Sequence, residues 1–197
     1  MPYPSSSSSS SSSSRPSIHV PSIITPAYPS PSQAYNYQQR FLTGATEIIP
    51  RLYISDLSFA ENPSCLSSHG ITHIVSAISG RVLIPPESAL HPHPQPRRLH
   101  IRVEDCPFAE LAAHLPMTTA WIRDALRSGP DTRVLVHCAE GISRSVSVVA
   151  AFLMAQYGWT PAQAVRYIKS KRRAADPNFG FVQQLGEYAK SLGQPAS

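Results

Sequence analysis

A cysteine and an arginine are separated by five residues in the segment His137-Cys138-Ala139-Glu140-Gly141-Ile142-Ser143-Arg144-Ser145. A cysteine thiolate is a strong nucleophile, and the guanidinium fork of arginine binds two oxygens of a phosphate group at once. Gly141 allows the backbone between them to turn tightly. The segment therefore combines a group that attacks phosphorus with a group that grips phosphate oxygens, which indicates chemistry on phosphate esters.

The residues on either side of this segment predict the elements that position it. Residues 133–136 form a short apolar run typical of a buried strand, and residues 146–154 form a longer apolar run typical of a helix. The segment is then the loop that opens the helix, where backbone N–H groups and the helix dipole stabilise an anion. A free cysteine titrates near ~8.5, and a helix N-terminus beside a cation lowers that to roughly 3.5 to 7.5. We therefore expect Cys138 to be a thiolate at cellular pH.

This arrangement predicts a function for each residue of the loop. We expect Cys138 to be the nucleophile, Arg144 to grip the phosphate, and Ser145 to offer its hydroxyl to the departing sulfur. His137 is expected to orient the loop through hydrogen bonds rather than to transfer a proton. The residues predicted to surround the phosphate are Ala139, Glu140, Gly141, Ile142, Ser143 and Arg144.

The reaction also requires an acid, because the oxyanion of serine, threonine or tyrosine is a poor leaving group. Residues 99–103 alternate as a strand, and Glu104 and Asp105 follow in a loop. Strand alternation directs neighbouring side chains to opposite sides, so only one of the two faces the loop of Cys138. We take Asp105 as the candidate acid, with Glu104 and Glu110 as the alternatives.

The Cys-x5-Arg loop followed by serine resembles the signature of the cysteine-dependent protein tyrosine phosphatase superfamily. Its form, His-Cys-x-x-Gly-x-Ser-Arg-Ser, is most similar to the dual-specificity protein phosphatase family. Residues 48–55, 70–75 and 177–181 extend the resemblance, which covers residues 44–192. It implies that Asp105 acts first as general acid and then as base for the attacking water. It also implies that Asn178 helps to hold the phosphate loop.

Alternating strands and helices predict a layered α/β domain. The resemblance implies a three-layer fold like that of protein tyrosine phosphatases, with a central, mostly parallel sheet of about four or five strands flanked by helices. The expected strands lie near residues 46–54, 72–78, 98–103 and 133–137, and the expected helices near 63–69, 115–128, 145–157, 160–173 and 179–191.

The chain has 197 residues, of which 42% are hydrophobic, enough to bury one core of ordinary size. Residues 1–43 contain ten consecutive serines and then scattered prolines, and such a composition does not fold by itself. We predict a disordered Ser/Pro-rich tail over residues 1–43 and a dual-specificity phosphatase catalytic domain over residues 44–193. The tail is too short for the docking domain of some kinase-directed relatives, so the chain resembles a compact, atypical member of the family.

Cysteine usage and hydropathy predict where the protein acts. The three cysteines show no Cys-x-x-Cys spacing, no apolar run reaches the about eighteen residues of a membrane span, and no secretory signal is visible. We therefore expect an intracellular protein, cytoplasmic or nuclear or both, without membrane contact. No zinc-ligand pattern occurs, and we expect neither metal nor cofactor. Cys106 and Cys65 are candidates for a redox partner of an oxidised Cys138.

The net charge of +5 invites a search for an anionic partner. The basic run over residues 169–173 is interpreted as the solvated end of a helix rather than as a nucleic-acid surface, because no aromatic interleaving accompanies it. A second hypothesis concerns Arg97, Arg98 and Arg102. We expect them to border the loop of Asp105, where they attract acidic phosphopeptides.

Phosphorylated proteins are the predicted substrates, and protein kinases are candidate partners. No long insertion or phosphotyrosine-clamping loop precedes Gly44, which favours a shallow site that accepts phosphoserine and phosphothreonine as well as phosphotyrosine. A lipid or sugar phosphatase is one alternative. Inositide-directed relatives commonly carry a lysine in the loop, whereas Glu140 here repels a multiply charged headgroup and also departs from the small residue common in the family. A catalytically weak phosphoprotein-binding module is the other alternative, against which the joint presence of Cys138, Arg144 and Asp105 argues.

Overall fold

The computed structural model describes residues 44–83, 85–86, 89 and 94–194, and the predicted tail over residues 1–43 lies outside them. A five-stranded sheet with the order β1-β2-β5-β3-β4 forms its centre. β1 and β2 form an antiparallel hairpin, whereas β2, β5, β3 and β4 run parallel. The strands are β1 (Thr46–Ile49), β2 (Leu52–Ser55), β3 (His73–Ala77), β4 (Arg97–Ile101) and β5 (Val134–His137).

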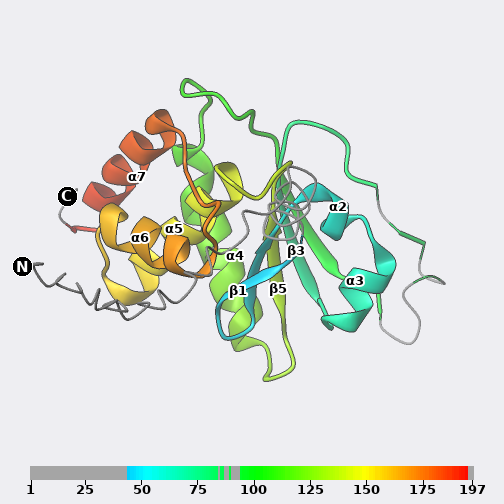
Figure 1. Cartoon of the computed structure of the whole chain (residues 1–197). Coiled ribbons are helices and arrows are strands. Elements are labelled where there is room, and N and C mark those ends of the chain that lie inside the picture. The colour runs from blue at the N-terminus through cyan, green and yellow to red at the C-terminus, as the bar shows by residue number, and fades with distance from the viewer. Residues whose placement is uncertain (1–43, 84, 87–88, 90–93, 195–197) are drawn as a thin grey trace, which may run out of the picture.

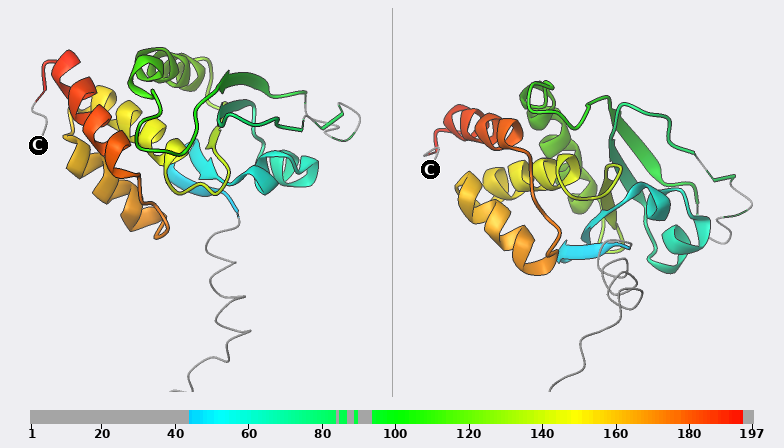
Figure 2. Two further views of the ribbon diagram at one scale, coloured as in Figure 1. Left: turned by 90° about the horizontal axis from the view of Figure 1, so that it is seen from above. Right: turned by 45° about the horizontal axis from the view of Figure 1, so that its top comes forward.

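Helices cover both faces of this sheet, as Figure 1 shows. One face carries the short helices α2 (Leu57–Ala60) and α3 (Pro63–Ser68). The other face carries α4 and α5, and α6 and α7 lie side by side with α5 (Figure 2). These helices are α4 (Leu115–Arg127, after the 3-10 turn η2 at Ala112–His114), α5 (Arg144–Tyr157), α6 (Pro161–Lys171) and α7 (Phe179–Ser191). The predicted three-layer α/β fold with a mostly parallel sheet is confirmed.

β5 lies between two parallel neighbours, and its apolar run is explained by burial on both faces. Val134 and Val136 pack into the core beneath α5, whereas Leu135 packs into the smaller core beneath α2 and α3. All strands except β1 point their carboxyl ends to the same edge of the sheet, where ligands bind in open α/β sheets. Cys138 follows β5 at that edge.

The strand predicted over residues 46–54 is in fact two strands joined by a tight turn. Arg51 adopts a positive φ of 71° in this turn, and its backbone N–H donates to the Glu47 carboxylate at 2.8 Å. The Arg51 guanidinium donates to the backbone carbonyl groups of Leu126 and Gly129 at 3.0 and 2.7 Å, which holds the hairpin against the end of α4. A single apolar stretch in the sequence therefore provides both strands of a hairpin.

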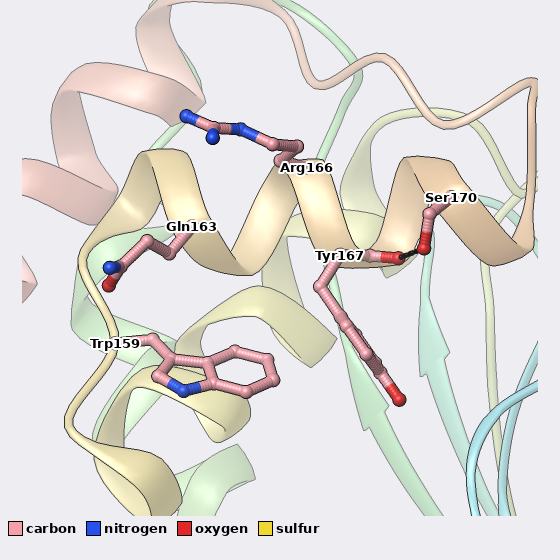
Figure 3. A pocket seen from close by; sticks show the side chains of 5 residues that line it. All are labelled: Trp159, Gln163, Arg166, Tyr167 and Ser170. Carbon is pink, nitrogen blue, oxygen red and sulfur yellow. Dashed lines mark hydrogen bonds between the residues drawn. The ribbon is translucent and has the colours of Figure 1, made fainter.

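α6 returns along α5 toward the loop of Cys138. Gly158, with a φ of 71°, ends α5 at the far end from that loop, and α6 begins three residues later at Pro161, behind the cap Thr160. Trp159 and residues of α6 as far as Ser170 line a groove of about 360 Å³ along this helix (Figure 3). Because α6 runs antiparallel to α5, its last turn comes back to the edge of the sheet where Cys138 lies.

Candidate active site

Cys138 is buried, with 1% of its surface exposed, in the loop that joins β5 to α5. Its Sγ accepts a hydrogen bond from the backbone N–H of Gly141 at 3.2 Å. The hydroxyl oxygen of Ser145, in the first turn of α5, lies 3.3 Å from the same sulfur. Both groups are able to donate to a thiolate, so they stabilise negative charge on Cys138.

The carbonyl groups of this loop are all bound by donors outside it. The contacts are from the Leu57 N–H to Ala139 (3.0 Å), from Arg172 to Glu140 (3.3 Å) and Gly141 (2.8 Å), from the Asp176 N–H to Ile142 (2.8 Å) and from the Ser147 N–H to Ser143 (2.9 Å). In a trans peptide the N–H that follows points opposite to each carbonyl group. The N–H groups of residues 140–144 therefore face inward, and that of Gly141 reaches the sulfur, which makes the loop a cradle for a tetrahedral anion.

Arg172 holds two of these carbonyl groups, and the sequence did not reveal it. The interpretation of residues 169–173 as a solvated helix end is wrong for Arg172, because only 2% of this residue is exposed. Its guanidinium also donates to the Gly44 carbonyl and the Thr46 hydroxyl at 3.2 and 3.1 Å. Burial lowers the pKa of Arg172, and the nearby Asp56 and Cys138 oppose that shift.

The helical spacing of the buried residues of α6 predicts that Arg172 is buried. The buried residues of α6 are Pro161, Ala164 and Ile168, and Arg172 is the next position on the same face. The basic neighbours of Arg172 hide this pattern, since they occupy the exposed positions of the last turn. The spacing of buried positions along the helix therefore distinguishes Arg172 from its neighbours, whereas the number of basic residues does not.

Gly141 lies where no other residue fits. Its φ of 70° falls in the left-handed region that favours glycine. A Cβ atom added there would lie 2.6 Å from the Arg172 guanidinium and 2.6 Å from the Ser55 carbonyl oxygen. The close approach of β2 and Arg172 to the loop thus depends on the absence of a side chain at this position.

Asp105 is the carboxylate that the structure brings to Arg144. Its Oδ2 lies 3.2 Å from Arg144 Nε, and its Oδ1 accepts from the Ser143 hydroxyl at 2.7 Å and from the Asn178 amide at 2.9 Å. Of the two alternatives, Glu110 accepts the N–H of Ala113 within η2, and Glu104 is exposed, as Asp105 is.

Arg144 and Ser145 form the start of α5, and this helix has no side-chain cap. Ser143 stands at the N-cap position, but its hydroxyl donates to Asp105 instead of accepting from the helix. Arg144 is buried, and its Nη1 donates to the Val103 carbonyl at 3.4 Å. The first N–H groups of α5 are thus left without a side-chain acceptor at the anion cradle.

Asn178 and His137 lie behind the loop and fix its position. The Asn178 N–H donates to Ser143 at 3.1 Å, while its side-chain oxygen caps α7 by accepting the Phe181 N–H at 3.0 Å. His137 contacts the Cys138 carbonyl through Nδ1 at 3.2 Å and the Ser76 hydroxyl through Nε2 at 2.7 Å. Burial lowers the pKa of His137 to about 4, so the imidazole is neutral at neutral pH. Since a carbonyl group only accepts, Nδ1 carries the proton and Nε2 accepts from Ser76.

α7 holds the loop of Asp105 at further points that the sequence did not reveal. Gln184 accepts from the N–H groups of Leu111 and Ala112 at 2.7 and 2.8 Å and donates to the Ala109 carbonyl at 2.9 Å. Gly180 touches the backbone of Pro107 so closely that a Cβ atom has no room there. Together with Asn178, these residues fix the segment 105–112 against one helix.

The hypothesis that Arg97 and Arg98 border the loop of Asp105 is wrong. Arg97 begins β4 and pairs with His73 at the amino ends of the parallel strands, which is the opposite edge from Cys138. The guanidinium nitrogens of Arg98 are buried and make no hydrogen bond within the described part of the chain. Arg102 is exposed and is the member of this group that lies close to Asp105 along the chain.

Comparison with known proteins agrees with this geometry. The family model "Dual specificity phosphatase, catalytic domain" matches residues 52–191. "Dual specificity protein phosphatase 1" of Arabidopsis thaliana is 36% identical over 141 residues, which are 72% of this chain and 67% of the relative. "Dual specificity protein phosphatase 13B" of Homo sapiens is 34% identical over 157 residues, 80% of this chain and 78% of the relative. The crystal structure of human DUSP28 matches with a TM-score of 0.64 and 32% identity over 76% of this chain and 95% of that chain.

The fold and the cradle around Cys138 define a cysteine-dependent phosphatase. The chain belongs to the dual specificity phosphatase family, and its substrates are phosphorylated proteins. Its activity is the hydrolysis of phosphotyrosine and of phosphoserine or phosphothreonine. Among the described helices, none is long and apolar enough to cross a lipid bilayer.

Proposed function

We propose that Cys138, as a thiolate, attacks the phosphorus atom of a phosphorylated side chain bound in the loop. A sulfur–phosphorus bond forms while the bond from phosphorus to the serine, threonine or tyrosine oxygen breaks. Asp105 gives its proton to the departing oxygen, and Arg144 binds two of the phosphate oxygens. The products of this step are the free hydroxyl side chain and a phosphorylated Cys138.

Water completes the reaction in a second step. The Asp105 carboxylate takes a proton from the attacking water, whose oxygen forms a new bond to phosphorus. The sulfur–phosphorus bond breaks, and the Ser145 hydroxyl donates to the departing thiolate. Inorganic phosphate leaves, and Cys138 and Asp105 return to their starting states.

The contacts of the Cys138 sulfur carry this proposal. The Gly141 N–H at 3.2 Å and the Ser145 hydroxyl at 3.3 Å both suit a thiolate before attack and again on departure. The inward N–H groups of residues 140–144 surround the same point, so a phosphate that they bind lies beside the nucleophile. Ala139 contributes to the cradle through its carbonyl contact with α2.

The surroundings of Asp105 support its role as acid and base. Its contact with Arg144 puts the carboxyl group next to the side chain that binds the phosphate, so a proton on it is close to the leaving oxygen. Ser143 and Asn178 hold Oδ1, and the incoming phosphate takes the place of Oδ2 at Arg144. His137 and Asn178 act by holding the loop.

A protein substrate suits the edge of the loop better than an inositide does. Glu140 is exposed at this edge, and its carbonyl is bound by Arg172, which fixes the backbone that carries the carboxylate. A carboxylate there repels a headgroup that bears several phosphates more strongly than it repels a single phosphorylated side chain.

A substrate panel with two variants tests the mechanism. The panel contains phosphotyrosine, phosphothreonine and doubly phosphorylated peptides and an inositide, and the variants are Cys138→Ser and Asp105→Asn. We expect phosphate release from the peptides by the wild type, no release by Cys138→Ser, and a loss by Asp105→Asn that is smaller for a substrate with a good leaving group. Mass spectrometry of rapidly acidified reactions should find one phosphoryl group on the Cys138 peptide.

Other results would favour the alternatives. Faster hydrolysis of the inositide than of every peptide would indicate a lipid phosphatase. Tight binding of a phosphopeptide without any phosphate release by the wild type would indicate a binding module. A phosphoryl group on another residue would exclude Cys138 as the nucleophile.

We also propose that residues 44–193 form the catalytic domain behind a disordered tail of residues 1–43, and that the protein acts in the cytoplasm or nucleus with protein kinases among its partners. The match of the family model to residues 52–191 supports the domain boundary. All three cysteines are free thiols, which suits a reducing compartment. Limited proteolysis of the full chain should leave a stable fragment that begins near Gly44, and stable fragments that retain the serine tract would contradict the boundary.

A further inference from the structure

Three of the large apolar side chains that the described residues expose gather near Asp105. Phe108, Phe179 and Val182 are 92%, 63% and 42% exposed. Large apolar side chains on the surface of a protein mark binding sites when they are grouped rather than scattered. The position of these three side chains therefore indicates which ligand binds them.

Backbone contacts bring the three residues to one side of the catalytic loop. Pro107, which precedes Phe108, touches Gly180, which follows Phe179, so the two phenylalanines lie on adjoining backbones. Val182 lies three residues after Phe179 on the same face of α7. We call Phe108, Phe179 and Val182 the hydrophobic rim.

The hydrophobic rim borders the groups that act on the phosphate. Asn178, the neighbour of Phe179, donates to Asp105, and both residues contact Ser143 of the phosphate loop. Phe108 lies three residues beyond Asp105 in the same loop. An extended peptide advances about 3.3 Å per residue. A chain whose phosphorylated residue reaches Cys138 thus passes the rim within a few residues.

We propose that the hydrophobic rim binds an apolar side chain of the substrate beside its phosphorylated residue, a selectivity that rests on the proposed function of the site. Removal of that side chain from water drives the contact. The anchoring of residues 105–112 on α7 holds the backbone on both sides of the rim in place before substrate arrives, so little backbone ordering is needed on binding. Arg97 lies at the other edge of the sheet and the guanidinium of Arg98 is buried, so attraction of acidic peptides by them does not compete with this selectivity.

Matched phosphopeptides test the proposal. Two phosphotyrosine peptides of equal length and charge carry leucine or serine at the two positions on each side of the phosphotyrosine. For the wild type we expect kcat/KM to be about tenfold higher for the leucine peptide, mainly through a lower KM, which corresponds to about 1.4 kcal/mol. The double variant Phe108→Ser, Phe179→Ser should reduce this preference to within about twofold.

Three controls separate the rim from the chemistry. Hydrolysis of a small aryl phosphate should be unchanged in the double variant, because this substrate does not reach the rim. Tyr157→Ser removes an exposed aromatic ring at the far end of α5 and should keep the preference for leucine. Replacement of both phenylalanines by leucine should restore the preference, since leucine also offers an apolar surface.

Specific outcomes would overturn the proposal. One is a wild type that shows no preference for leucine, and another is a double variant that keeps the full preference. A third is a dimer at the assay concentration that the double variant dissociates, since a second copy would then cover the rim. A wild type that fails to hydrolyse the aryl phosphate would instead sink the proposed function of Cys138.

Discussion

Helices α5 and α6 pack against each other, but they begin in opposite ways. In α6, Thr160 accepts the Gln163 N–H at 3.3 Å and Gln163 accepts the Thr160 N–H at 2.9 Å, so the helix satisfies its own first donors. In α5, Ser143 occupies the cap position but donates to Asp105, and the first donors face the anion cradle. A helix start that caps itself serves the fold, whereas a helix start left uncapped is available to a ligand.

The largest effect on this comparison should come from Gly141→Ala. The added Cβ meets Arg172 and Ser55 at 2.6 Å in a left-handed backbone, so the N–H that points at Cys138 must move. We expect kcat/KM for an aryl phosphate to fall about a hundredfold, which is the effect of losing one oriented donor. Steady-state rates check this expectation.

Gly158→Ala provides the matched control at the other end of α5. Its φ of 71° is nearly the same as that of Gly141, but no atom lies within 4 Å of the added Cβ. Urea unfolding should show a loss of about 1 kcal/mol from backbone strain, with unchanged kcat/KM. Equal losses of kcat/KM in Gly141→Ala and Gly158→Ala would contradict a role of the Gly141 N–H in the anion cradle.

Removal of the Arg172 guanidinium should have the next largest effect. Arg172→Met leaves the Glu140 and Gly141 carbonyl groups without this donor, which costs about 2 kcal/mol of loop stabilisation, or roughly thirtyfold in kcat/KM. Arg173→Met, at the exposed next position, should leave the rate unchanged. Similar rates for both variants would contradict the role of Arg172 in holding the loop.

The pH dependence of the free energy of unfolding tests the start of α5, because the loop before α5 contacts the buried, neutral imidazole of His137. The pKa of His137 is about 4 in the folded protein, against about 6.5 in the unfolded chain. Between these values the unfolded chain binds more protons, so stability falls as pH decreases from 6.5 to 4, by on the order of 2 to 3 kcal/mol. Urea unfolding at a series of pH values should show a smaller decrease for His137→Gln than for the wild type.

The smallest effect is expected at the start of α6. Thr160→Ala removes the capping oxygen and should lower the free energy of unfolding by about 1 kcal/mol. Because α6 satisfies its own donors away from the cradle, kcat/KM should stay within about twofold of the wild type. A large loss of activity here would mean that the two helix starts are not independent.

Local patterns in the sequence predicted much of this architecture. The capping residues at Thr160 and Gln163 predicted the start of α6 within one residue, and the family resemblance at residues 177–181 predicted the start of α7, which was expected over residues 179–191 as observed. The strand, loop and helix around Cys138 were also expected. α2 was not predicted, because four residues are too few to show a helical period of apolar residues. Its start depends on the Asp56 cap.

The candidate site was predicted where neighbours in sequence are neighbours in space. Strand alternation showed that only one of Asp105 and Glu104 faces the loop, the family resemblance favoured Asp105, and the structure brings Asp105 to Arg144. Arg172 and Gln184 reach the site from distant helices, and their contacts are with backbone groups, which leave no pattern of residue types. Contacts of this kind, between a side chain and a distant backbone group, can be identified only from the folded structure.

The anchoring of residues 105–112 on α7 also sets the order in which the enzyme becomes competent. The residues of the thiol loop have all been made once Arg144 is added, but Asn178 and Gln184, which hold the segment of Asp105, lie more than thirty residues later in the chain. Arg172, which holds the thiol loop itself, also follows later. A polypeptide still emerging from the ribosome therefore contains the proposed nucleophile before it contains the residues that hold the proposed proton donor in place. We therefore expect phosphate turnover only after α7 has docked.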